Sequence, residues 1–476
     1  MYAQSGNAVL AVNCRPGFSL KVGDNLLASH EGCEAILNDL LEASPAEFGR
    51  KDLGVLNLLC APSLPGSENL DIRECVARLA GLTEYVRSAT NRRVHRYSMD
   101  PEYGHSEPMW RMSMLITKVK RDFGAAYDPR IVASKEAGIR EPMADSRDMF
   151  IHGLLDDDPK RRWGTCASIP VLVTAVARRL AYPVGLAVAG RHIYARWEGR
   201  ESFNIEASNL MGMTIHSDDY YRQKIQPVVP GEESSAYYVR TLFPAEEFAL
   251  FLTMRVELLV NAARYDETLL WAARALQFAP HDPRFPHQAH EALEMALRHR
   301  SWRLFPQRRI PASGSGELFT VNFGELLAPE ERSLAHTIVA HFKESLGELD
   351  EARIHYEESC RQNFHGNNEQ RDLQRFLRRY NLPRARGPLW PPKNFGVQRC
   401  FKLACPPHEE AAILRFAADQ FERSGRFLQA RGASHDLYMF DPGDELVFQR
   451  ARAIEQRPQF QEQLAAAIKS ESGIDD

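Results

Sequence analysis

The chain has 476 residues, of which 44% are hydrophobic and 26% charged, and its formal net charge is −4. This composition is too apolar for a disordered chain and too polar for a membrane protein. The slightly negative charge gives no overall field that attracts nucleic acid or an anionic membrane, so we expect neither as a partner.

The N-terminus has no basic segment before an apolar run, so it does not read as a secretory signal. No segment approaches the roughly 18 to 20 apolar residues that a spanning helix needs. The eight cysteines are thinly scattered, which is typical of free thiols in a reducing compartment. We therefore expect a soluble, cytoplasmic protein.

No metal or other cofactor is expected. Cys400, Cys405 and His408 are the one group with metal-like spacing, but this group lacks a convincing fourth ligand. We favour the simpler interpretation that these cysteines are buried or incidental thiols.

Residues 1–50 form an N-terminal extension, with a short alternating strand at 6–14 and a helix over 29–43 that Ser29 can cap. A core domain of mixed helices and strands is then expected over residues 51–240. Its first part contains helices over 72–89 and 110–124, followed by a long, loop-rich stretch to residue 162. Long irregular stretches inside a compact domain are often functional.

The pattern of polar and apolar residues changes after residue 162. A tight turn precedes a buried helix over about 167–180. Three short runs, 184–190, 192–199 and 201–208, are rich in apolar and aromatic residues and are separated by turn residues. This pattern predicts a helix followed by an antiparallel meander of strands.

From residue 241 the chain is predicted to be all helical. Segments that start at Ala262 and Ser345 share a weak pattern at an offset of 84 positions, which resembles tetratricopeptide units over residues 241–385. Generic helical hairpins are the alternative. A Pro- and Gly-rich boundary at 386–396 opens a C-terminal helical region, 386–476. The arginine-rich stretch 371–386 is interpreted as a basic helix surface.

The strongest chemical signal is the ordered set Cys166, His192 and Glu206. Cys166 follows Gly164 and precedes an apolar helix, where free N–H groups and the helix dipole favour a thiolate. N–H groups of this turn, with Thr165, can also stabilise an oxyanion. Trp163 either lines the cleft or donates its indole N–H there, and core packing is the competing interpretation.

His192 begins a predicted strand in which polar and apolar residues alternate. The face that carries His192 can therefore point into a cleft. Glu206 lies in a following strand, where it can orient the imidazole. Asn204 shares a strand face with Glu206 and is the alternative orienting residue. His152, in the upstream loop, is a weaker acid/base candidate.

The stretch from Gly164 to Val184, with Gly190–Ser208, resembles the core of the bacterial SirB-type transglutaminase-like proteins. Residues 53–71 and 146–155 also resemble the N-terminal part of that family, and the likeness covers roughly residues 50–365. It implies an α+β, papain-like transglutaminase core followed by an all-α, tetratricopeptide-like domain. It also implies Cys166 as nucleophile, His192 as base and Glu206 as acid, although the wider superfamily commonly uses Asp at the last position.

Two functions follow as hypotheses. The first is a cysteine peptidase, amidase or transamidase that forms an acyl-thioenzyme on a protein or peptide substrate, with the helical domain recruiting a protein partner. The second is a catalytically silent core whose helices act as a binding scaffold, because some members of the family lack the cysteine.

Overall fold

The computed structural model describes residues 29–95, 106–136, 143–208, 212–225, 227, 229, 231–304, 326–363, 367–382 and scattered residues between 418 and 463. The chain divides into two compact units, residues 1–359 and 360–476. The expected boundary at residue 240 falls inside the first unit. The expected strand at 6–14, the stretch 386–396 and the group around Cys400 lie outside the described residues.

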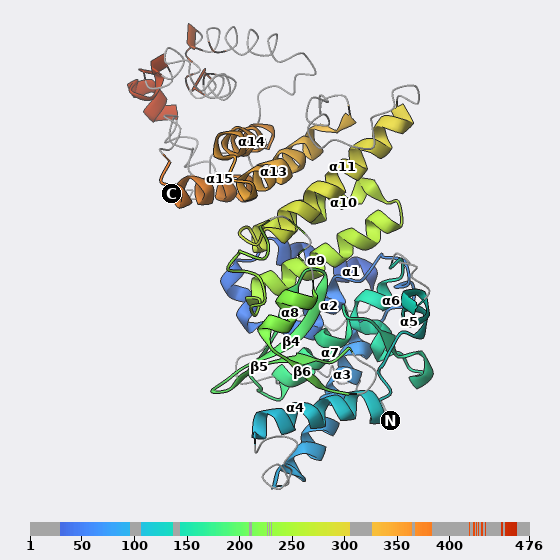
Figure 1. Ribbon diagram of the computed structural model, residues 1–476. Helices are drawn as coiled ribbons and strands as arrows, with labels where there is room; N and C mark the ends of the chain where they lie inside the picture. Colours follow the sequence, from blue (N-terminus) through green and yellow to red (C-terminus); the bar gives the residue numbers. More distant parts are fainter. Residues whose placement is uncertain are drawn as a thin grey trace, which may run out of the picture. The chain divides into compact units, whose positions relative to one another are not determined.

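The N-terminal half of the first unit is mainly helical (Figure 1), and its described residues include one short pair of strands. Its elements are α1 (His30–Leu41), η2 (Pro45–Arg50), α2 (Leu53–Leu59), α3 (Ile72–Asn91), α4 (Glu107–Thr117), η5 (Lys118–Asp122), β1 (Ala126–Tyr127), α5 (Pro129–Glu136), α6 (Ser146–Met149), η6 (Ile151–Leu155), η7 (Pro159–Arg161) and β2 (Trp163–Gly164). The predicted cap is confirmed, because the Ser29 hydroxyl accepts the Gly32 N–H at the start of α1.

The centre of the unit is α7 (Ile169–Arg179) and a four-stranded antiparallel sheet in the order β3 (Val184–Ala189), β4 (His192–Glu198), β5 (Ser202–Glu206) and β6 (Thr214–His216). The predicted three-strand meander is confirmed, and β6 extends it by one strand. Gly190, with a φ of +54°, lies in the two-residue turn between Ala189 and His192. A left-handed residue suits such a turn and costs glycine little.

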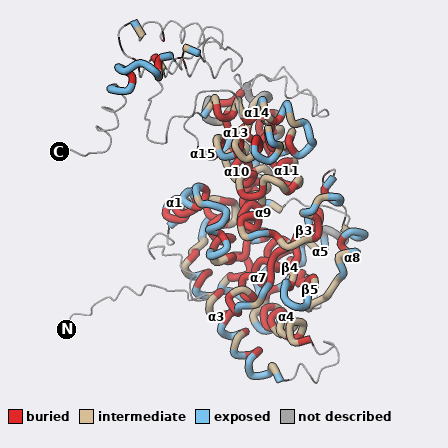
Figure 2. The backbone as a smooth tube through the Cα atoms, turned by 90° about the vertical axis from the view of Figure 1, so that its left-hand side faces the viewer, coloured by how far each residue is buried: buried red, intermediate tan, exposed pale blue. Residues whose placement is uncertain are grey.

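Helix α7 packs against β3 and β4, and residues Ile169–Ala177 are all buried. Figure 2 shows this helix and the neighbouring strands as a buried centre. The reason lies in the sequence, because α7 is apolar on every side until its last turn. Helix α7 therefore holds the turn that precedes it in a fixed position.

Strands β1 and β2 form a separate parallel pair, in which Ala126 lies opposite Trp163 and Tyr127 opposite Gly164. No prediction anticipated this pair. It joins the end of the α4–η5 helix to the chain segment just before α7.

Helices follow the sheet: α8 (Asp218–Lys224), α9 (Pro244–Asn261), α10 (Tyr265–Phe278), α11 (Arg284–Leu304), α13 (Pro329–Ser345) and α14 (Leu349–Gln362). One apolar core runs from α1 to α13. Helix α15 (Asn367–Arg379) lies in the second unit. The molecule mixes helix and sheet, as expected for an α+β protein, and none of the described helices is long and apolar enough to span a membrane.

Candidate active site

Cys166 lies in the turn between β2 and α7, and it is half-buried. The turn is tight at Gly164, where an added Cβ would lie 2.6 Å from the Ser168 Oγ and 2.8 Å from a Leu154 methyl group. Gly164 therefore lets the backbone pass close to its neighbours on the way to the thiol.

Hydrogen bonds from two hydroxyl groups fix the shape of this turn. The Thr165 and Ser168 hydroxyls both donate to the Asp148 carbonyl, over 2.8 and 3.1 Å. The Thr165 N–H donates to the Ser168 Oγ, and the Thr165 Oγ1 accepts the Ala167 N–H, each over 3.0 Å. The prediction that Thr165 serves the oxyanion is therefore corrected: its donors are committed to holding the turn.

His192 lies at the start of β4, and its Nε2 is 2.5 Å from the Glu206 Oε2. In the ladder Arg196 pairs with Asn204, so by the same register His192 and Glu206 are diagonal neighbours on one face of β4 and β5. The His192 ring also makes a side-chain hydrogen bond with Cys166. Because Nε2 is engaged by Glu206, Nδ1 is the nitrogen that remains for the thiol.

The surroundings favour a charged imidazole. Burial opposes the charge, but the hydrogen bonds with Cys166 and Glu206 outweigh it and raise the pKa of His192 to about 10. Burial also opposes the Glu206 carboxylate. The hydrogen bond with His192 and the Ser208 N–H, which donates over 2.9 Å, nevertheless keep the pKa of Glu206 below its usual value.

Sequence reasoning missed Tyr127. Its hydroxyl donates to the Cys166 side chain and accepts a hydrogen bond from the Cys166 backbone. Burial first, and then the interactions with the Cys166 side chain, raise the pKa of Tyr127, whereas the hydrogen bond from the Cys166 backbone lowers it. A two-residue strand has no periodicity, so only the pairing of β1 with β2 reveals that Tyr127 belongs to the site.

Asn204 does not orient His192. Its Oδ1 accepts from Arg196 over 2.7 Å, and its Nδ2 donates to Asp218 over 2.8 Å and to the His216 carbonyl over 3.0 Å. Of Asn204 and Glu206, the structure brings only Glu206 to the imidazole.

Trp163 lies at the surface, whereas His152 is buried. Trp163 is 37% exposed, so the core-packing interpretation is wrong and the ring lies at the surface, three residues before the thiol. His152 is buried beside Ser146, with its Nε2 3.2 Å from the Oγ, and burial lowers its pKa to about 4. The charged groups that act on His152 are Asp145, Arg147 and Glu68, none of which belongs to the cluster around Cys166.

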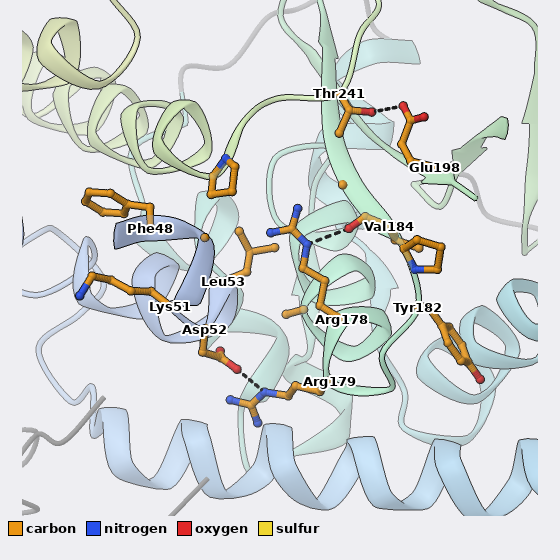
Figure 3. A pocket seen from close by; sticks show the side chains of 15 residues that line it. Phe48, Lys51, Asp52, Leu53, Arg178, Arg179, Tyr182, Val184, Glu198 and Thr241 are labelled. Carbon is orange, nitrogen blue, oxygen red and sulfur yellow. Dashed lines mark hydrogen bonds and ion pairs between the residues drawn. The ribbon is translucent and has the colours of Figure 1, made fainter. Parts of the chain in front are cut away.

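A cavity of about 380 Å³ lies at the other end of α7 (Figure 3). It is lined by Arg178 and Arg179, near which Asp52 and Glu247 form ion pairs with these arginines. The residues that line this cavity do not include Cys166, His192 or Glu206. It is therefore a separate feature from the cluster around Cys166.

Among the residues that the structure describes, no group of three or more His, Cys, Asp or Glu side chains is arranged to hold a metal ion. The cluster is instead suited to nucleophilic acyl chemistry, which needs a thiol, a base in contact with it and an acid behind the base. In comparisons with known proteins, no family model matches the chain, and neither the curated proteins nor the solved structures include a significant match.

Proposed function

We propose that this chain is a thiol-dependent acyl-transfer enzyme, a cysteine peptidase, amidase or transamidase with a papain-like, transglutaminase-type core. The observation that carries the proposal is the position of His192, which hydrogen-bonds Cys166 on one side and Glu206 on the other. The order of Cys166, His192 and Glu206 in the sequence, with the thiol just before a buried helix, is consistent with the same roles.

In the first step the Cys166 sulfur attacks an amide or ester carbonyl while the proton of the thiol resides on His192. The C–S bond forms and the carbonyl π electrons move to oxygen, giving a tetrahedral intermediate. His192 then passes its proton to the leaving amine or alcohol as the C–N or C–O bond breaks, which leaves a thioester. Glu206 holds the ring and stabilises its charge throughout.

Tyr127 is the proposed oxyanion donor. Its hydroxyl already lies against both the sulfur and the backbone of Cys166. Once the C–S bond forms, the sulfur is neutral and no longer holds the Tyr127 proton, so this O–H can turn to the substrate oxygen as that oxygen becomes negative. This role replaces the one that the sequence assigned to Thr165.

In the second step water or an amine attacks the thioester, and His192 accepts its proton. The C–S bond breaks and the proton returns to the sulfur, which regenerates the enzyme. Both acceptors are compatible with the same three residues, so the proposal covers hydrolysis and transamidation.

The helical part is proposed to recruit a protein substrate or partner through tetratricopeptide-like packing. Helices α10 and α14 each have 14 residues and begin 84 positions apart, at Tyr265 and Leu349, as the internal repeat predicts. Helix α10 packs on α9 and α11, as consecutive helices of such arrays do.

The test is selective alkylation. Purified protein is treated with limiting iodoacetamide at pH 7, and labelled cysteines are mapped by peptide mass spectrometry. Cys33, Cys60 and Cys75 are the internal references, because burial raises their pKa values to about 11, 12 and 12. We expect Cys166 to react at least about tenfold faster than these thiols, because only a thiolate is an effective nucleophile.

A second experiment replaces His192. His192→Gln should slow alkylation at Cys166 and leave the three reference thiols unchanged. If Cys166 reacts no faster than the buried references, and Cys166→Ala leaves capture of a protein partner intact, the enzyme proposal fails and the scaffold hypothesis replaces it.

A further inference from the structure

The turn that leads into His192 is held by a side chain from a later part of the chain. Gly190 and Arg191 connect β3 to β4, and His192 is the next residue. The Gly190 N–H donates over 3.1 Å to the Oε1 of Glu232, which lies 42 positions further along the chain. The Oε2 of Glu232 accepts the Val229 N–H over 3.4 Å, so each carboxylate oxygen binds a backbone group.

Glu232 is buried and faces the helical part of the chain. Its side chain is 1% exposed, and its Oε1 lies 3.9 Å from the Nε of Arg284, the first residue of α11. Arg284 is also buried and forms an ion pair with Asp282. At the surface, Arg191 and Glu291 of α11 lie 3.9 Å apart, but an exposed pair of this kind contributes little. Glu232 is therefore the main polar link between the β3–β4 turn and the start of α11.

The end of β4 at His192 lies beyond the part of the strand that pairs with β5. The described ladder between β4 and β5 covers Ala195–Glu198, whereas the ladder with β3 extends to the pair of Ala189 and His192. Strand ends open more readily than the middle of a sheet. A displacement of about 1 Å in a reacting group can lower a rate roughly 100-fold. The bond from Gly190 to Glu232 thus acts where a small movement would carry the imidazole away from the thiol.

The chemistry of Glu232 suits a role in geometry more than in stability. Taking charges out of water is costly, and apolar residues of similar size often give an equally stable protein. A carboxylate supplies what an apolar side chain cannot, namely acceptors at fixed places for two buried N–H groups. Replacing Glu232 by an apolar residue would leave the Gly190 N–H without this acceptor.

We infer that Glu232, held by Arg284, is a positioning residue that keeps His192 beside Cys166, so that the helical part of the chain helps to build the active site. This inference rests on the proposed function, because it concerns the base of the same thiol. Glu232 takes no part in bond making or breaking and acts through the Gly190 backbone. Loss of this anchor should leave the thiol in place but without a well-placed acceptor for its proton.

The experiment measures the rate constant for alkylation of Cys166 by iodoacetamide at pH 7 and at pH 9.5. We expect Glu232→Ala to slow the reaction about 10- to 100-fold at pH 7 but less than about threefold at pH 9.5, because a free thiol has a pKa of about 8.5 and then ionises unaided. Glu232→Gln keeps an oxygen that can accept the Gly190 N–H and should stay within about threefold of wild type at both pH values. A protein that is merely destabilised would instead expose its buried reference thiols to the reagent.

Glu247 supplies the matched control. It is also 1% exposed, its Oε1 accepts the Leu186 N–H of β3 over 3.2 Å, and it forms an ion pair with Arg178. Glu247→Ala therefore removes a similar buried carboxylate from the same sheet, away from the β3–β4 turn. We expect its rate constant at pH 7 to stay within about threefold of wild type.

If either alanine variant fails to fold, Glu232→Asp and Glu247→Asp are compared in the same way. Aspartate keeps the charge but shortens the side chain by one methylene group, so Glu232→Asp should still slow the reaction at least about fivefold at pH 7. Equal rate constants at pH 7 for the matched variants at the two positions overturn the inference, as does a loss at pH 9.5 as large as that at pH 7. Both results leave the proposed function standing if wild-type Cys166 still reacts faster than the reference thiols. A wild-type Cys166 that reacts no faster than those thiols overturns both.

Discussion

The Nε2 of His192 lies 2.5 Å from the Oε2 of Glu206, across two neighbouring strands and 14 positions apart in the chain. The two residues are diagonal partners in the β4–β5 ladder, so the register of the sheet sets their distance. The His192 ring also forms a hydrogen bond with the Cys166 side chain. The bond to Glu206 thereby fixes the ring beside the thiol.

Replacing Glu206 should affect reactivity, and replacing Asn204 should affect mainly stability. Glu206→Gln keeps the size of the side chain but removes the charge that stabilises the imidazolium, so we expect alkylation of Cys166 to slow roughly 10- to 1,000-fold. Asn204→Ala breaks the contacts to Arg196 and Asp218 and should alter that rate less than about threefold. The rate constants of both variants with iodoacetamide at pH 7 test this prediction. An equal loss of rate in both variants would contradict the assignment of Glu206 as the residue that orients His192.

Tyr127→Phe should separate acyl chemistry from thiol reactivity. The variant removes the hydroxyl beside Cys166 and retains the ring. Acylation by p-nitrophenyl acetate, which builds an oxyanion, should slow about 100-fold, whereas alkylation by iodoacetamide, which builds none, should change less than about threefold. The first is measured as the burst of p-nitrophenol. Similar effects on both reactions would show that Tyr127 acts on the sulfur alone.

Gly164→Ala should destabilise the protein by about 1–3 kcal/mol, because the new methyl group meets the Ser168 Oγ and Leu154 at less than contact distance. The matched control is Gly81→Ala. Gly81 lies inside α3 with nothing within 4 Å of an added Cβ, and alanine there should stabilise by about 0.5–1 kcal/mol. Urea unfolding followed by circular dichroism gives both values, and opposite signs are expected.

The pH dependence of stability should reveal the charged imidazole. The pKa of His192 is raised from its usual value to about 10, so protonated His192 stabilises the folded state fully below about pH 6.5, and this contribution is lost as pH rises through 10. Wild type should therefore lose about 1–3 kcal/mol more than His192→Gln between pH 6.5 and 10. Urea unfolding at a series of pH values measures the difference. Parallel curves for the two proteins would rule out an imidazolium at this position.

Local patterns in the sequence predicted the elements that carry the site. The apolar run after Cys166 predicted a buried helix, and α7 is one, because a helix that is apolar on all sides has no stable place at the surface. Alternation around His192 and Glu206 predicted two neighbouring strands, because side chains point to opposite faces of a sheet in turn.

The same patterns left open which polar residues meet. Glu206 and Asn204 share a face, and only the register of β4 with β5 decides that Glu206 contacts the imidazole while Asn204 joins Arg196. Thr165 has the residue type and position for an oxyanion donor, but its hydrogen bonds within the turn commit it to structure.

The sequence by itself determined the order Cys166, His192 and Glu206, together with the helix and strands that hold them, because hydrophobic periodicity is a local property. Only the tertiary structure brought Tyr127 to Cys166. That approach depends on the chain returning from β1 to pair with β2, a contact between residues 126 and 163 that no local pattern encodes. Pairing across such a distance is decided by how the whole core packs, and two-residue strands are too short to leave a periodic signal.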